Sequence, residues 1–317
     1  MSIDCLSVGV LVADHLCAPI LRVPHAGELL LTDHLLLNIG GCASNAAMDL
    51  ARVGVKVAVV GCVGDDAFGR FVIETLDARG VDTGSILRLP DVGTSGTLII
   101  NVSGEDRRFI HTIGANGRLS AADIPLERVR QAKVFYVGGF FLMPGLRADE
   151  LTELFRQARA AGVVTMLDVV VPGPGDYWPQ LEPLLAETDV FLPNNDEAAL
   201  LCGLDDPRRQ AERFHAAGAK TVVITCGGEG TVLVAESLRL QAETYPVTYV
   251  GATGAGDAFD AGFIAGLLEG GDVRRCLEWG SALGASCVRS IGATDSVFTR
   301  DEALAFMRQH RLKMREW

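Results

Sequence analysis

Short runs rich in valine and isoleucine alternate with longer segments of helical hydrophobic period along most of the chain. This alternation is typical of an α/β fold, in which helices flank a central, mostly parallel sheet. The strands are predicted at residues 5–12, 56–62, 133–138, 163–168, 189–192, 221–226 and 231–235. The helices are predicted at residues 43–53, 66–79, 148–161, 195–202, 208–217, 255–269, 273–289 and 300–309.

Two regions interrupt this order. Residues 15–37 and 84–114 alternate apolar and polar positions, and the second carries a hairpin turn at Ser103-Gly104-Glu105-Asp106. We expect both regions to form a small β-sheet over the edge of the large sheet where α/β folds bind ligands, and so to act as a lid. No low-complexity tract or Pro/Ser linker divides the chain, so residues 1–317 are predicted to form a single domain.

The composition narrows the classes of partner. With a formal net charge of -12 and a pI near 5.0, the chain offers no basic stripe for nucleic-acid phosphates. No apolar run reaches the roughly 18 residues that a membrane span needs. The eight cysteines stand singly, which indicates core residues in a reducing compartment. Because the N-terminus has no basic region typical of a signal peptide, we expect a cytoplasmic protein.

The stretch GATGAGDAFDAGF, residues 251–263, places four glycines ahead of an apolar helical pattern. Glycines let backbone amides approach a ligand, and a helix N-terminus favours negative charge, so the stretch indicates an anion site. Asp257 lies within it, where a simple helix cap is the alternative interpretation. The GxxxxGK[ST], GxSxG and HExxH motifs are absent, and no GxGxxG follows the first strand.

Three motifs together resemble the ribokinase-like (PfkB) family of carbohydrate and nucleoside kinases. They are GATGAGDAF, IGGCASNAA at residues 39–47 and PNNDEAALLCG at residues 193–203. The motifs follow the family's order, and the two interrupting regions fall where the family has its lid. The weaker elements TCGGEG at 225–230, GANG at 114–117 and IGATDS at 291–296 agree. The resemblance covers nearly the whole chain and implies a ribokinase-like fold.

The resemblance implies roles for the residues of the GAGD stretch. In the family, the aspartate is the catalytic base that takes the proton of the acceptor hydroxyl. The preceding backbone amides form an anion hole for the γ-phosphate. Carried over, Asp257 is the base, and Gly254, Ala255 and Gly256 line the hole, which agrees with the anion site indicated by the glycines.

The resemblance also implies an ATP and magnesium side. Asn194 and Glu197 match the family's NxxE, which holds magnesium and the triphosphate mainly through water, so Glu197 is the expected metal residue. A helix N-terminus after Pro193 is the alternative for this pair. Three further residues match the nucleotide-side TxGxxG, for which a plain turn is the alternative: Thr225, Gly227 and Gly230. Weaker candidates are Asp168 for the metal, and Arg107 and Arg108, which are more simply explained as solvated lid charge.

On the acceptor side, Asp14 ends the first strand in VADHL, where family members use an aspartate to bind two sugar hydroxyls. Gly40, Gly41 and Asn45 match the family's GGxxxN, whose amide bonds a sugar hydroxyl. A carboxylate and an amide together offer the acceptors and donors that hydroxyls need. A capping role for Asp14 and a buried helix amide for Asn45 are the alternatives.

The chain departs from the family pattern in two places. Members usually carry an aspartate three residues before the GAGD glycine and use it to bind a monovalent cation, but this chain has Gly251 there. A monovalent cation is therefore doubtful, although Ser296 matches another of its ligands. Residues 137–141 supply no acid where ribokinase has a sugar-contacting glutamate, so ribose is not the expected substrate.

The resemblance implies an ATP-dependent kinase that uses Mg²⁺ to phosphorylate a hydroxymethyl group of a sugar or sugar-like polyol. A nucleoside kinase, a non-catalytic sugar-binding regulator and an NAD-dependent oxidoreductase are the alternatives. A nucleoside kinase would need an aromatic lid residue that stacks on the base, and Phe109 is the only aromatic residue in the predicted lid. A homodimer through the lids is also expected, because six lid leucines exceed what a thin sheet can bury: Leu29, Leu30, Leu31, Leu35, Leu36 and Leu37.

Overall fold

The computed structural model describes residues 3–105 and 108–317 and contains two sheets, a large one and a small one. The large sheet runs, in spatial order, β14 (Met314–Glu316), β13 (Leu238–Ala242), β12 (Thr231–Ala235), β11 (Thr221–Thr225), β10 (Val190–Phe191), β9 (Val164–Leu167), β8 (Val134–Gly138), β1 (Cys5–Gly9), β4 (Val57–Gly64) and β5 (Asp82–Leu89). The strands from β11 to β5 pair in parallel, whereas β12, β13 and β14 are antiparallel. The predicted mostly parallel sheet is confirmed.

The order of the strands positions the ligand site. From β1 the chain builds β4 and β5 on one side, and then β8, β9, β10 and β11 on the other. In open α/β sheets, the crevice beyond the strand ends at such a reversal is where ligands bind. The carboxyl ends of β1, β8 and β9 are therefore the expected floor of the site.

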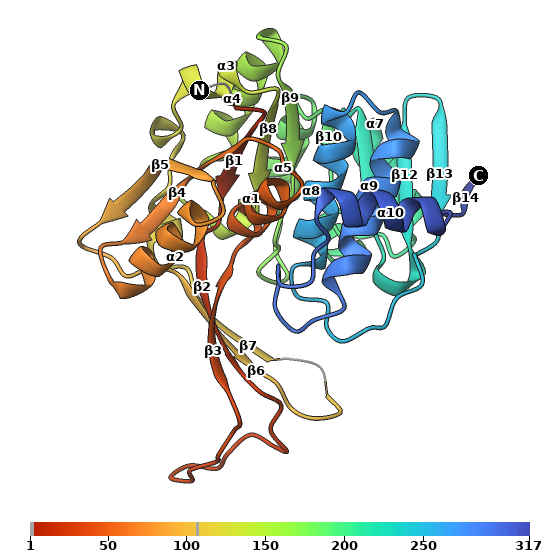
Figure 1. Ribbon diagram of the computed structural model, residues 1–317. Helices are drawn as coiled ribbons and strands as arrows, with labels where there is room; N and C mark the ends of the chain where they lie inside the picture. Colours follow the sequence, from red (N-terminus) through yellow and green to blue (C-terminus); the bar gives the residue numbers. More distant parts are fainter. Residues whose placement is uncertain (1–2, 106–107) are drawn as a thin grey trace.

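Helices cover both faces of the large sheet (Figure 1). One layer contains α1 (Cys42–Arg52), α2 (Ala67–Asp77), α8 (Ala255–Leu268), α9 (Val273–Cys287) and α10 (Arg300–Gln309). The other contains α3 (Leu126–Gln131), α4 (Ala148–Ala160), α5 (Trp178–Leu185), α6 (Asn195–Cys202) and α7 (Pro207–Ala216). Each layer closes its own apolar core against the sheet.

All eight predicted helices are present, with ends within two residues of those expected. The prediction missed α3, α5, β13 and β14. Helix α5 has Pro179 in its first turn and Pro183 inside it, and prolines of this kind obscure a helical pattern. In the described part of the chain, no helix has the length and apolar character to cross a membrane.

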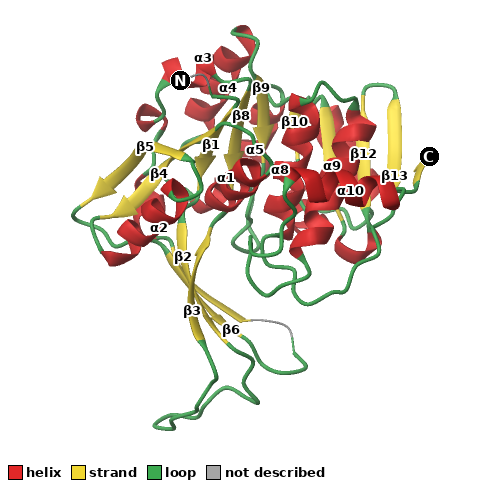
Figure 2. Ribbon diagram, in the orientation of Figure 1, coloured by secondary structure: helices red, strands yellow, loops and turns green. Residues whose placement is uncertain are grey.

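The small sheet is the predicted lid, and it projects from one edge of the large sheet (Figures 1 and 2). Its strands, in spatial order, are β3 (Leu35–Gly40), β2 (Val12–Cys17), β6 (Gly96–Ile100) and β7 (Arg108–Thr112). Strands β6 and β7 pair antiparallel, as the expected hairpin requires, and Asp106 of its turn lies outside the described residues. We call these four strands, with their connecting loops, the lid.

Three boundaries of the lid differ from the prediction. Residues 84–89 belong to β5 of the large sheet and not to the lid. The first strand ends at Gly9, whose φ is 147° and whose Cβ, if it had one, would lie 2.1 Å from Gly138 O. The chain then turns into β2, so Asp14 lies within a lid strand. Leu29, Leu30 and Leu31 lie in the loop between β2 and β3.

Candidate active site

The GAGD stretch forms the start of α8, with Asp257 in its first turn. Gly254 is the N-cap at φ 77°, and a Cβ there would lie 2.5 Å from Ala293 O. Gly256 is exposed, and a Cβ there would meet no atom within 4 Å, so open space adjoins its backbone. The Ala255 amide donates to Ala252 O at 3.2 Å, a bond that an anion would have to replace. The helix start is open to a ligand at Gly256.

The carboxylate of Asp257 is held by α1. Asn45 Nδ2 donates to Asp257 Oδ2 at 2.8 Å, and Asn45 is almost completely buried. Burial raises the pKa of Asp257, whereas hydrogen bonds from Asn45 and Cys42 lower it. A base with a raised pKa suits proton transfer near neutral pH. The geometry therefore fits Asp257 to accept a proton.

Cys42 is a residue of this site that the sequence analysis missed. Its Sγ and one carboxylate oxygen from each of Asp168 and Asp257 all lie within 4.8 Å of one another. The only sequence signal was its position directly after the paired glycines of the IGGCASNAA motif. Asp168, which follows β9, is thereby placed beside Asp257, and Gly139 N donates to Asp168 Oδ2 at 3.1 Å.

Asp14 reaches the same site from the lid. It is buried and hydrogen-bonds with Thr97 of β6, which excludes a helix-capping role. Gly40 leaves room for this side chain, because a Cβ there would lie 2.0 Å from Asp14 Oδ2 and would displace the carboxylate. Burial raises the pKa of Asp14 to about 6, the bond from Thr97 lowers it, and the charge of Asp257 raises it. Gly41 is the N-cap of α1, so the glycine pair lies between Asp14 and Asn45.

Asn194 and Glu197 form a capping box at the start of α6. Asn194 Oδ1 accepts from the amides of Asp196 and Glu197 at 3.0 and 2.9 Å, and Glu197 Oε2 accepts from Asn194 N at 3.1 Å. The local contacts of Asn194 and Glu197 are thus those of a helix N-terminus, which was the alternative interpretation of this pair. Burial raises the pKa of Glu197 to about 7, with the charge of Asp257 among the other causes. Glu197 therefore also belongs to the electrostatics of the site.

A cavity of about 410 Å³ adjoins the start of α8. Six of the predicted residues line it together: Asn194, Thr225, Gly227, Gly230, Ala255 and Gly256. The sequence analysis missed three aromatic lining residues, Tyr245, Tyr249 and Phe259. A pocket of this size with aromatic walls and a few polar groups is typical of a small-ligand site.

Buried carboxylates surround the base. Burial raises the pKa of Asp168 and of Asp260 well above the usual range, and the charges of neighbouring acids add to both shifts. Asp260 lies one turn after Asp257 on α8, and its Oδ2 accepts a hydrogen bond from Tyr136 OH at 2.9 Å. Ionising several buried carboxylates close together costs free energy unless a cation neutralises them, and carboxylate oxygens are ligands that Mg²⁺ prefers.

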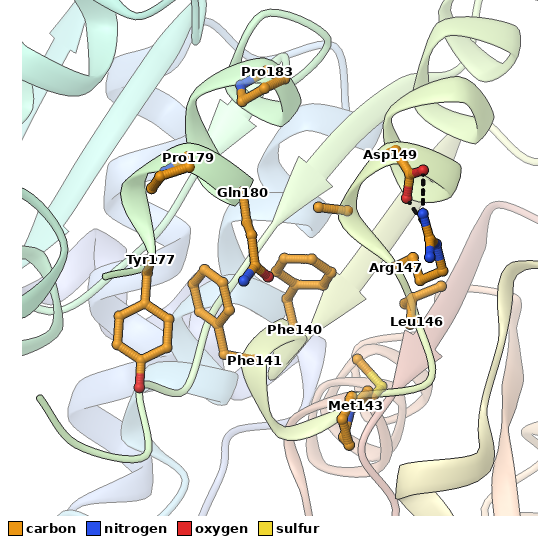
Figure 3. Close-up of a pocket in the computed structure, with 12 residues that line it drawn as sticks. Phe140, Phe141, Met143, Leu146, Arg147, Asp149, Tyr177, Pro179, Gln180 and Pro183 are labelled. Carbon is orange, nitrogen blue, oxygen red and sulfur yellow. Dashed lines mark hydrogen bonds and ion pairs between the residues drawn. The ribbon is translucent and has the colours of Figure 1, made fainter. Parts of the chain in front are cut away.

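A second cavity, of about 590 Å³, is lined by residues between β8 and the start of α4 and by residues at the start of α5 (Figure 3). The rings of Phe140 and Phe141 lie between Tyr177 on one side and the Arg147–Asp149 ion pair on the other. None of the predicted site residues lines this cavity.

The remaining candidates are placed as follows. Arg108 is an exposed residue of β7 and forms an ion pair with Glu105, whereas Arg107 lies outside the described residues. Ser296 Oγ donates to the carbonyls of Ser286 and Cys287 at 2.7 and 3.0 Å. Gly251 is buried, and its amide donates to Val288 O.

Known proteins resemble this chain in architecture and in sequence. Residues 6–300 match the model of the pfkB family carbohydrate kinases. An uncharacterized sugar kinase of Archaeoglobus fulgidus is 30% identical over 79% of this chain and 98% of its own length. A ribokinase of Haemophilus influenzae is 29% identical over 95% of this chain and 97% of its own length.

A solved structure agrees with these relatives. Arabidopsis thaliana ribokinase, in complex with ribose and ATP, superposes with a TM-score of 0.83 at 26% identity. The match covers 97% of this chain and 99% of that structure. The chain therefore belongs to the pfkB family of carbohydrate kinases and is an ATP-dependent sugar kinase.

Proposed function

We propose that the enzyme transfers the γ-phosphoryl group of ATP to a hydroxymethyl group of a sugar or sugar-like polyol, with Asp257 as catalytic base. The observation that carries this proposal is the position of Asp257. It stands in the first turn of α8, hydrogen-bonded to Asn45, between the nucleotide-sized cavity and the lid aspartate Asp14. A base between the two ligand sides is what in-line transfer requires.

Each side of the site has a separate task in this reaction. The acceptor is bound by Asp14 and Asn45, with Gly40 and Gly41 allowing its close approach to the backbone. Asp257 takes the hydroxyl proton as the oxygen attacks phosphorus. The amides at the start of α8 stabilise charge on the transferred group, and the lid limits access of water. Asn194, Thr225, Gly227 and Gly230 contact ATP along the cavity.

The residues present fit a bound Mg²⁺. The charge of Asp257 raises the pKa of both Asp168 and Glu197, and the charge of Glu197 raises that of Asp168, so a divalent cation would relieve the repulsion among these carboxylates. Glu197 and Asn194 would hold the ion mainly through water, because their capping box occupies Glu197 Oε2 and Asn194 Oδ1. When bound, Mg²⁺ would neutralise negative charge on the transferred phosphoryl group.

The test is a coupled assay of ADP formation with ATP, Mg²⁺ and a panel of sugars, polyols and nucleosides. We expect turnover with at least one sugar or polyol. Phosphorus NMR should then show that the product is a primary phosphate ester. Turnover confined to nucleosides would replace the proposal with nucleoside kinase. Sugar binding without any ADP formation would replace it with the non-catalytic regulator.

We further propose that two copies associate through their lids. The lid face that does not carry Asp14 presents exposed apolar side chains in register, Leu37, Leu98 and Ile110. Leu35 at the start of β3 is 79% exposed. An exposed apolar area of this kind usually marks a partner surface. None of the eight cysteines, all of which the structure describes, forms a disulfide, which suits a reducing compartment such as the cytoplasm.

A further inference from the structure

The thiol of Cys287 joins two loops beside the start of α8. Cys287 is the last residue of α9 and is completely buried. Its Sγ donates to Thr253 O at 3.2 Å and to Ala293 O at 3.0 Å, so the one thiol proton is shared between two carbonyls. Thr253 directly precedes the N-cap of α8, and Ala293 lies in the loop between α9 and α10. The thiol therefore connects three segments of the chain at one point.

Both carbonyls depend on this thiol for a donor. In the part of the chain that the structure describes, no backbone amide donates to Thr253 O or to Ala293 O. Ala293 is buried and Thr253 is half-buried. A carbonyl that is removed from water and has no donor costs free energy. Without the thiol, we therefore expect the peptide unit between Thr253 and Gly254 to turn toward another donor.

The direction of the Thr253 carbonyl sets the direction of the Gly254 amide. The two groups belong to one peptide unit, and in a trans peptide the C=O and the N–H point in opposite directions. None of the described peptide bonds is cis. The bond from Cys287 thus directs the Gly254 N–H away from the thiol. No described backbone carbonyl accepts from this N–H, which leaves it for an anion at the helix start.

The glycine at position 254 makes such an anchor necessary. Glycine adopts the φ of 77° found there without strain, and for the same reason its peptide unit turns more readily than that of any other residue. Its Cα lies close to Ala293, because a Cβ would be 2.5 Å from Ala293 O. Cys287 holds this same carbonyl as well as that of Thr253. One thiol thereby limits the freedom of Gly254 from both of its neighbours.

We propose that Cys287 is a positioning residue of the anion hole, whose thiol fixes the Thr253 and Ala293 carbonyls so that the Gly254 amide faces the transferred phosphoryl group. The inference rests on the proposed kinase function, because it concerns the same site. Cys287 is not among the described residues that line the cavity of about 410 Å³, so it acts through Gly254. Amides fixed in advance toward developing charge raise kcat more than they raise the affinity for substrates.

Three variants of the full chain test this role by steady-state kinetics. Cys287→Ala removes the donor and should lower kcat at least about 10-fold, a part of the roughly 10²- to 10³-fold that loss of a whole donor costs. The KM values for ATP and acceptor should stay within about threefold. Cys287→Ser keeps a donor and should retain more than about a third of the wild-type kcat. Cys276→Ala, a buried change on the same helix, is the matched control and should leave kcat within about twofold.

Three kinetic results would overturn the inference. They are a kcat of Cys287→Ala within about twofold of wild type, equal losses of kcat in Cys287→Ala and Cys276→Ala, and a serine variant as slow as the alanine variant. Thermal melting followed by circular dichroism shows whether each variant is folded. If Cys287→Ala does not fold, Cys287→Val replaces it, because valine also lacks a donor and fills more of the space of the thiol.

Binding separates this inference from the kinase function. We titrate the full chain with ADP and Mg²⁺ by calorimetry, with and without aluminium fluoride, which mimics a phosphoryl group during transfer. Aluminium fluoride should tighten ADP binding to the wild type, and Cys287→Ala should lose at least about 10-fold of this gain while binding ADP alone within about twofold. That result supports the inference even if no acceptor is phosphorylated and the proposed function fails. An equal gain in both proteins, or no gain in the wild type, overturns it.

Discussion

Asn45 Nδ2 donates to Asp257 Oδ2 at 2.8 Å although the two residues are 212 positions apart in the chain. The bond joins the start of α1, which follows strand β3 of the lid, to the start of α8, which borders the cavity of about 410 Å³. It fixes the direction of the carboxylate and stabilises its charged form. The start of α1 and the start of α8 are thereby joined through one side-chain contact.

Asp257→Asn should lower kcat about 10²- to 10⁴-fold, the usual contribution of a positioned base. The amide keeps the size of the side chain but cannot take a proton. ATP affinity, measured by titration, should stay near the wild-type value. Asp205→Asn, the same change at an exposed site, should leave kcat unaltered. A variant that retains more than half of the wild-type kcat would remove Asp257 from the role of base.

Asn45→Ala should move the acidic limb of the kcat/KM profile to higher pH. The bond from Asn45 lowers the pKa of Asp257, so its removal raises that pKa and the base stays protonated over a wider range. Profiles between pH 5 and 9 for wild type and variant would measure the shift. An unchanged or downward-shifted limb would show that Asn45 does not stabilise the ionised base.

Asp14→Ala should mainly raise KM for the acceptor and leave KM for ATP nearly unchanged, because Asp14 lies on the lid. In wild type, the carboxylate is ionised above its pKa of about 6, so acceptor KM should rise as the pH falls through that value. The alanine variant should lose this rise. If ATP affinity fell and acceptor affinity held, Asp14 would belong to the nucleotide side.

Potassium should change the activity less than about threefold, or ~0.65 kcal/mol at ~1.4 kcal/mol per decade. Gly251 supplies no carboxylate, the Ser296 hydroxyl donates to two carbonyls, and the Cys287 thiol lies 3.2 and 3.0 Å from Thr253 O and Ala293 O. The assay compares initial rates in potassium chloride and tetramethylammonium chloride at equal ionic strength. Activation of tenfold or more would show that neutral ligands suffice to bind the ion.

Light scattering at micromolar concentration should give about twice the 33.7 kDa mass of the chain. Ile110 is 61% exposed on the apolar lid face of the single chain, and we expect the dimer to bury it. Ile110→Glu should therefore shift the enzyme to monomer, because the dimer would bury an unpaired charge. Glu182→Lys, an exposed change on α5, should leave the mass unaltered. A wild-type mass near 34 kDa would contradict association through the lids.

Local periodicity was sufficient to predict most elements. The eight predicted helices are present because apolar spacing and helix starts such as Thr299 and Asp272, which cap α10 and α9, are encoded within a few residues. The position of Asp257 at a glycine-rich helix start was likewise visible, since a helix N-terminus has a local signature. Short or proline-containing elements such as α5 carry no such pattern and were missed.

Contacts between distant segments were decided only by the tertiary structure. β1 ends at Gly9, which lies so close to Gly138 of β8 that a Cβ would not fit, and Asp14 lies in β2 of the lid and not at the end of the first strand. Thr97 hydrogen-bonds to Asp14 because the register of β2 and β6 places the two residues opposite each other, and register depends on how separate segments pair. The raised pKa values of Asp14 and Glu197 follow from burial. Sequence spacing specifies neither strand register nor burial, because both arise only when segments far apart in the chain pack together.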